Sequence, residues 1–177
     1  MKHLLLKRKD FRQEIKKYST KKAIQNLTKF PVSTKDLYDV SEIPVLTESA
    51  VRHMDPYNFK ESAKNGVIIL LDVLGNEVGH FICIWRNKHG WNYFDSYGSK
   101  IESPTLKEYF SGERVFYNSV RYQKPTLNTC GSHCCLRLAY MDLNEKEYYD
   151  KIIELITELG LTPDDLAMSM YVLDSED

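Results

Sequence analysis

Four residues of this 177-residue chain have side chains suited to nucleophilic chemistry. Cys130 offers a thiol, His80 an imidazole that gains and loses a proton near neutral pH, and Asp95 a carboxylate able to orient the ring. Gln123 supplies a carboxamide, a group that can stabilise an oxyanion. Together these residue types can attack a carbonyl carbon, transfer a proton and bind the charge that develops on oxygen.

The elements around His80 and Asp95 are expected to bring the two side chains together. Three segments rich in Val, Ile and aromatic residues follow one another, separated by turns, and are predicted to be strands: 66–74, 78–86 and 91–95. In such a β-meander, a residue near the start of one strand lies beside a residue near the end of the next. We therefore expect Asp95 to accept a hydrogen bond from one imidazole nitrogen of His80, which leaves the other nitrogen for a thiol.

Cys130 is expected to open a helix, because Leu136 and Tyr140 follow it at helical spacing. An ordinary thiol is only about 3% ionised at pH 7. The positive end of a helix dipole and a neighbouring imidazolium both favour the thiolate. The backbone N–H of Cys130 and the carboxamide of Gln123 are expected to receive the oxyanion, and losing one such donor typically costs about 2.7–4 kcal/mol.

The remaining pattern predicts an α+β domain in which helices flank a small central sheet, mixed or antiparallel. A further strand is expected within 115–122, whereas 29–44 is interpreted as connecting chain. Amphipathic spacing and capping residues predict five helices: 10–27, 48–54, 130–140, 145–159 and 163–172. Asn144 and Glu147 are the capping pair expected for the fourth of these. We expect the whole chain, 1–177, to form one domain with a basic helical segment over about 1–45.

Length and composition exclude several classes of protein. A chain of this size, 42% hydrophobic and 28% charged, needs neither disulfides nor a structural metal for stability. Its four cysteines are too few and too clustered for a disulfide framework, so free thiols are expected. The apolar run 67–71 is far shorter than the roughly 18 residues of a membrane span. The apolar centre at 4–6 is too short for a secretory signal, so we expect an intracellular protein without membrane contact.

Charge is distributed unevenly along a chain whose formal net charge is −1. Residues 1–35 contain 11 Lys and Arg against 2 Asp and Glu, and residues 142–177 contain 2 against 11. The basic segment is interpreted either as a solvated helix face, facing the acidic C-terminal part, or as a contact for an acidic partner or DNA. A DNA contact would be to phosphates and non-specific, because no base-reading motif is present.

Several spaced motifs together resemble one known family. They are Gly79-His80-Phe81, the run from Tyr93 to Gly98, Gln123, and Cys130-Gly131 followed by Cys134-Cys135. This pattern is similar to that of the adenain-like (adenovirus-type) cysteine proteases, whose clan includes the SUMO and ubiquitin-like proteases. The resemblance covers 79 to about 138. Two positions depart from the adenovirus pattern: Asp95 stands in place of Glu, as in the SUMO-protease branch, and Phe81 replaces a Trp that commonly follows the histidine.

The resemblance implies a thiol endopeptidase with a papain-like arrangement and adenain-like topology, and no metal or cofactor is expected. His80 would act as general base and acid, Asp95 would orient it, Gln123 would line the oxyanion hole and Cys130 would be the nucleophile. Relatives usually cut after small residues, often glycine. Viral members cut capsid and core precursors during particle maturation, so the implied location is the virion and the infected host cell, in its cytoplasm or virus factory. The expected source is a small double-stranded DNA virus, a virophage or a related element.

Other interpretations remain open at this stage. The chain could remove ubiquitin-like modifiers as a SUMO-type isopeptidase, or it could be an inactive DNA-binding or scaffold module. Asp72 is an alternative orienter, and Cys83 is expected in the core on the strand face opposite Ile82 and Ile84. His133 is an alternative base that lacks a carboxylate beside it in sequence. A metal site is a further alternative, with candidate ligands crowded into six positions: Cys130, His133, Cys134 and Cys135.

Overall fold

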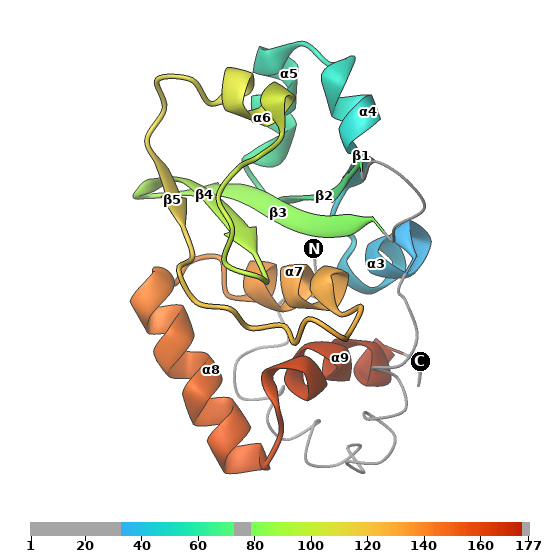
Figure 1. The fold of residues 1–177 in the computed structure, drawn as a ribbon, viewed down its shortest axis with the longest axis vertical. Coiled ribbons are helices and arrows are strands. Elements are labelled where there is room, and N and C mark those ends of the chain that lie inside the picture. The colour runs from blue at the N-terminus through green and yellow to red at the C-terminus, as the bar shows by residue number, and fades with distance from the viewer. Residues whose placement is uncertain (1–32, 73–78, 175–177) are drawn as a thin grey trace.

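The computed structural model describes residues 33–72 and 79–174. The predicted helix at 10–27, most of the basic segment and the turn expected at 75–76 lie outside the described residues. The described residues form an α+β fold in which helices lie on both faces of a central mixed sheet (Figure 1). The predicted fold class is therefore confirmed.

The sheet has five strands in the spatial order β1-β2-β3-β4-β5. Its bounds are β1 Val45–Thr47, β2 Val67–Leu71, β3 His80–Asn87, β4 Gly90–Asp95 and β5 Val115–Tyr117. The three central strands pair antiparallel, as the β-meander predicts, and the two short outer strands pair parallel to their neighbours. The register between β3 and β4 places Asp95 opposite Ile82, so His80 lies two residues beyond that pair on the same face.

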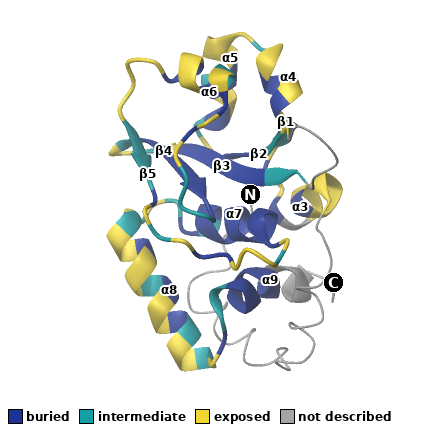
Figure 2. Ribbon diagram, in the orientation of Figure 1, coloured by how far each residue is buried: buried dark blue, intermediate teal, exposed yellow. Residues whose placement is uncertain are grey.

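Helices cover the two faces of the sheet in separate groups (Figure 1). One face is covered by α4 Glu48–Arg52, α5 Pro56–Ala63 and α6 Pro104–Tyr109. The other face packs against α3 Thr34–Ser41 and α7 Cys130–Ala139, with α8 Glu145–Leu159 and α9 Pro163–Asp174 completing that side. Helix α7 is thereby enclosed between the sheet and α9, and Figure 2 shows it buried along its length.

Alternation along β3 divides the core into two clusters. Phe81, Cys83 and Trp85 pack toward α7, whereas Ile82 and Ile84 pack toward α4 to α6. The prediction that Cys83 is a core residue on its own face is confirmed, because its side chain is fully buried there. Burying one large apolar side chain typically contributes about 1.5–3 kcal/mol, so the two clusters hold the helices on the sheet.

Capping residues set the helix boundaries, some of which match the boundaries predicted from the sequence while others differ. Helix α8 begins with the predicted capping box of Asn144 and Glu147 and ends at Gly160 in the left-handed conformation. The segment interpreted as connecting chain instead contains α3, which starts with a capping box at Ser33 and buries Leu37. Pro56 occupies the first position of α5, and Asp55 caps this helix.

The strand expected within 115–122 ends at Tyr117. Beyond it, the side chain of Asn118 turns inward and donates to the carbonyl oxygens of Asp95 and Val120, at 2.6 and 3.0 Å. These side-chain hydrogen bonds take the place of backbone pairing between strands, so the chain leaves the sheet here and continues toward Gln123.

Candidate active site

His80 and Asp95 meet at the end of the β3–β4 hairpin. The Nε2 atom of His80 lies 2.9 Å from Oδ1 of Asp95, and the side chain of Asp95 is only 5% exposed. The backbone N–H of Tyr97 donates to the same oxygen at 2.7 Å. The backbone of Asp95 is also held, because its N–H donates to Oδ1 of Asn118 at 2.9 Å. The carboxylate therefore has a fixed position from which to orient the imidazole.

Cys130 approaches His80 from the opposite layer, at the first residue of α7. Its Sγ accepts a hydrogen bond from the backbone N–H of Phe81 at 3.5 Å, and the thiol lies close enough to His80 to raise the pKa of the imidazole. Because Asp95 engages Nε2, the nitrogen of His80 left for the sulfur is Nδ1. The structure thus brings together a thiol, an imidazole and a carboxylate that lie up to 50 residues apart in the sequence.

The surroundings of His80 favour its protonated form. Burial by itself disfavours the imidazolium, but the hydrogen bonds to Asp95 and Cys130 and the charges of these two groups outweigh burial. As a result the pKa of His80 is raised from 6.5 to about 9. A proton held on the ring at neutral pH is what a thiolate–imidazolium pair requires.

The ring of Tyr97 forms a wall against His80. The phenol ring and the imidazole are stacked, with centroids 5.0 Å apart and planes inclined by 22°. The guanidinium of Arg121 lies 5.5 Å from the centroid of the Tyr97 ring. Stacking limits rotation of the imidazole, so Tyr97 adds a second restraint to the hydrogen bond from Asp95. The sequence motif contains Tyr97, but its type alone gave no reason to assign it this position.

Gln123 lies beside the triad of His80, Asp95 and Cys130, and both polar atoms of its carboxamide are hydrogen-bonded. Its Oε1 accepts a hydrogen bond from the hydroxyl of Ser96 at 2.6 Å. Its Nε2 donates to the phenol oxygen of Tyr97 at 3.1 Å and to the carbonyl oxygen of Leu127. The predicted role in an oxyanion hole therefore requires one of the two Nε2 bonds to give way when substrate arrives.

A groove of about 690 Å³ runs along the sheet face beside His80 and Asp95. Glu48, a buried carboxylate, holds together part of the groove wall. It accepts hydrogen bonds from the hydroxyl of Ser103 at 2.5 Å and from the backbone N–H of Asp72 at 3.0 Å. The side chain of Asp72 lies in the same groove, 3.5 Å from Arg52. Asp95 rather than Asp72 is thus the hydrogen-bond partner of His80, and Glu48 is a groove residue that the sequence interpretation missed.

His133 and its neighbours lie in the interior instead of at the triad. His133 is 1% exposed, and its Nε2 lies 3.1 Å from Oδ1 of Asp164 on α9. The carboxylate that is absent beside His133 in sequence is therefore supplied from a distant helix. Cys134 is fully buried, and burial raises the pKa of its thiol well above the ordinary value. Within 33–72 and 79–174, no three His, Cys, Asp or Glu side chains are grouped so as to hold a metal ion.

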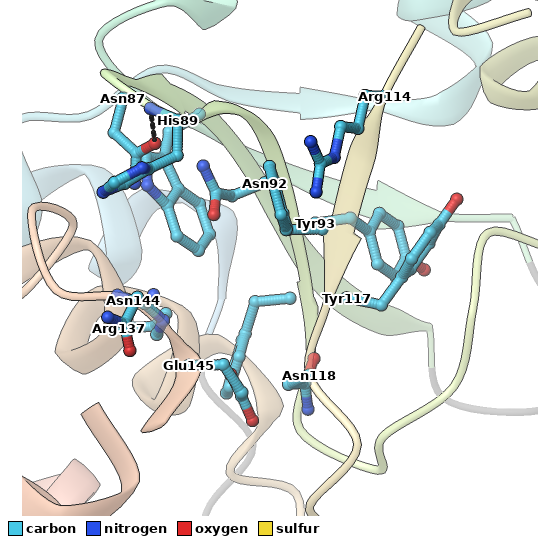
Figure 3. Close-up of a pocket in the computed structure, with 13 residues that line it drawn as sticks. Asn87, His89, Asn92, Tyr93, Arg114, Tyr117, Asn118, Arg137, Asn144 and Glu145 are labelled. Atoms are coloured by element: carbon cyan, nitrogen blue, oxygen red, sulfur yellow. Dashed lines mark hydrogen bonds between the residues drawn. The ribbon is translucent and has the colours of Figure 1, made fainter. Parts of the chain in front are cut away.

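A second cavity, of about 340 Å³, lies between β4, β5 and the start of α8 (Figure 3). Asn118 lines it, and the same side chain holds the backbone of Asp95, so this cavity adjoins the support of the triad. At its edge the guanidinium of Arg137 lies between the rings of Trp85 and Tyr148, 4.4 Å from each centroid. Its two terminal nitrogens donate to backbone carbonyls after α7, which ties this end of the helix in place.

Comparisons with known proteins give one informative similarity. No protein-family model matches the chain. The chain is similar to "Uncharacterized protein V9" of the Sputnik virophage, with 24% identity over 130 residues, covering 60% of this chain and 74% of the virophage protein. This similarity indicates a viral protein and assigns no reaction to it. In the part of the chain that the structure describes, no helix is long and apolar enough to span a membrane.

Proposed function

We propose that this chain is a viral thiol endopeptidase that cuts capsid or core precursor proteins after small residues, often glycine. The observation that carries the proposal is the position of His80, hydrogen-bonded to Asp95 at 2.9 Å and close to the thiol of Cys130 at the start of a helix. The resemblance of the surrounding motifs to adenovirus-type cysteine proteases supports the reaction. The similarity to a virophage protein supports the viral setting, with activity in the virion or the infected cell.

In the proposed reaction, the thiolate of Cys130 attacks the carbonyl carbon of the scissile peptide bond. The carbon–sulfur bond forms as the carbonyl π electrons move to oxygen, which becomes an oxyanion. The backbone N–H of Cys130 faces no earlier helical carbonyl, because it begins α7, and so it can donate to this oxygen. One N–H of the Gln123 carboxamide is the second donor, released from its resting bond.

His80 then acts as general acid and afterwards as general base. As the tetrahedral intermediate collapses, the carbon–nitrogen bond breaks and His80 gives its proton to the leaving amine, leaving a thioester on Cys130. A water molecule next attacks the thioester carbonyl while His80 accepts one of its protons. The carbon–sulfur bond breaks, the new carboxylic acid departs, and the thiolate and imidazolium are restored.

Burial of the triad supports a preference for small residues before the scissile bond. Only 20% of the side chain of His80 and 7% of Cys130 are exposed. A substrate residue with a branched or bulky side chain would meet protein before its carbonyl carbon came within reach of the sulfur. Glycine next to the cleaved bond avoids that contact.

The experiment that tests the proposal compares active and inactive protein acting on viral structural proteins. The chain is co-expressed with capsid and core proteins of a virophage, and new protein termini are identified by mass spectrometry. We expect new termini after glycine with the unaltered chain and none with Cys130→Ala. Cys134→Ala is the matched control, since it removes a buried thiol one helical turn away and should leave cleavage intact.

Two results would replace this proposal by another. Cleavage of Gly-Gly-ended conjugates of ubiquitin-like modifiers, with no cleavage of capsid-derived peptides, would assign the chain as an isopeptidase. Absence of labelling of Cys130 by a thiol-directed electrophile, together with salt-dependent DNA binding, would identify an inactive DNA-binding module.

A further inference from the structure

A buried carboxylate on α9, Asp164, contacts the loop that joins Gln123 to Cys130. Its Oδ2 accepts a hydrogen bond from the backbone N–H of Lys124 at 3.2 Å. Its Oδ1 accepts a hydrogen bond from the hydroxyl of Thr129. Lys124 directly follows Gln123 and Thr129 directly precedes Cys130. One side chain therefore holds the two residues that adjoin the oxyanion donor and the nucleophile.

Asp164 is suited to this position because it stays ionised inside the protein. Burial by itself raises the pKa of a carboxyl group, but the hydrogen bonds from His133 and Thr129 outweigh burial and lower the pKa of Asp164 below 3.8. Asp164 also lies in the first turn of α9, where the helix dipole favours a negative charge. Its 1% exposure keeps water from competing for these bonds.

The bond to Asp164 changes how α7 begins. Thr129 occupies the N-cap position, at which a threonine hydroxyl usually accepts a hydrogen bond from an N–H of the first turn. Here the Thr129 side chain makes no capping bond. Its hydroxyl is directed to Asp164 instead, so the first N–H groups of α7 have no side-chain acceptor at the cap. These are the groups that a thiolate and an oxyanion at Cys130 would use.

We propose that Asp164 is a positioning residue for the proposed hydrolysis, on which this inference rests. By holding the hydroxyl of Thr129 and the backbone of Lys124, it leaves the start of α7 uncapped for the reaction. It also fixes the loop between the two groups that would bind the oxyanion. A shift of about 1 Å at such groups can cost about a hundredfold in rate.

Two pairs of variants separate positioning from simple support of the fold. Asp164→Asn removes the charge and one acceptor, and Asp165→Asn is its matched control. Asp165 caps the same helix through Thr162, at 2.7 and 3.0 Å, and makes no contact with the 124–129 loop among those described. Thr129→Val removes the hydroxyl with little change in volume, and Thr129→Ser restores it.

Steady-state cleavage of a glycine-containing peptide gives kcat and KM, and alkylation of Cys130 followed by mass spectrometry shows that the thiol remains reactive. We expect Asp164→Asn and Thr129→Val to lower kcat about tenfold to a hundredfold with KM changed by less than about threefold. Thr129→Ser and Asp165→Asn should keep the kcat of the unaltered chain, although Asp165→Asn lowers the melting temperature.

The outcomes distinguish this inference from the proposed function. If the unaltered chain cleaves and is labelled, while Thr129→Val has an unchanged kcat, Asp164 is only structural and the inference is overturned. Thr129→Val decides the matter even if Asp164→Asn fails to fold. If the unaltered chain neither cleaves nor reacts at Cys130, the proposed function fails and this inference fails with it.

Discussion

His80 and Asp95, 15 residues apart in the chain, share a 2.9 Å hydrogen bond across the end of a hairpin. The acceptor oxygen also receives the backbone N–H of Tyr97, and the Asp95 backbone is bound by Asn118. The carboxylate is therefore held from several directions before any substrate binds. This preorganisation gives the first prediction.

Replacing Asp95 by asparagine should severely slow cleavage. The amide has nearly the same shape but lacks the charge that stabilises the imidazolium and fixes the tautomer. We expect kcat to fall about a hundredfold to ten-thousandfold in Asp95→Asn, measured with a fluorogenic glycine-containing peptide. Asp72→Asn is the control, because Asp72 lies in the same groove beside Arg52, and it should keep nearly full activity. Equal losses in the two variants would show that His80 has no specific orienter.

The raised pKa of His80 predicts a pH dependence of stability. A group whose pKa is higher in the folded state stabilises the fold when protonated, so its contribution is complete below the unfolded value of 6.5. That contribution is lost as pH rises through about 9. We expect the melting temperature of the unaltered protein to fall between pH 6.5 and 9 more steeply than that of His80→Gln. Parallel curves would mean that the folded-state pKa of His80 is not raised.

Tyr97 should act through its ring more than through its hydroxyl. Tyr97→Phe keeps the stack on His80 and frees one N–H of Gln123. We therefore expect its kcat to equal or exceed that of the unaltered chain. Tyr97→Ala removes the wall beside the imidazole and should lower kcat about tenfold. A Phe variant as slow as the Ala variant would show that the phenol hydroxyl is required.

The glycine after the nucleophile makes room for α3. A Cβ at Gly131 would lie 2.8 Å from both terminal carbons of Leu37, which is fully buried. Gly131→Ala should lower the free energy of unfolding by about 1–2 kcal/mol, since overpacking exceeds the gain in helix propensity. In a Leu37→Ala background the same change should instead raise stability by up to about 1 kcal/mol. Chemical denaturation of the four chains measures this reversal of sign, and additive effects would contradict the close contact.

The central hairpin and the start of α7 were accessible to sequence reasoning because their signals are local. Strand alternation, the turn at 87–90 and the helical spacing after Cys130 each act over a few residues. These local signals suffice to predict that His80 and Asp95 lie side by side, as the structure shows. The capping box of α8 is equally local and is present as predicted.

What the sequence did not reveal depends on contacts between distant segments. β1 has only three residues and exists through parallel pairing with β2, so no alternation marks it. Asp164 lies 31 positions after His133, and nothing in its own neighbourhood indicates a bond to that ring. The resting bond between Gln123 and Tyr97 likewise joins a loop to the end of a strand. Such contacts arise only when the helical layer packs on the sheet.

The division of the triad between layers has a consequence for synthesis. His80 and Asp95 leave the ribosome before Cys130, and Asp164 emerges after Cys130. Since chains emerge N-terminus first, an incomplete polypeptide has a base without a sulfur, or a sulfur without its anchor on α9. The triad of the proposed protease would thus be complete only after α7 has been synthesised and has packed on the sheet.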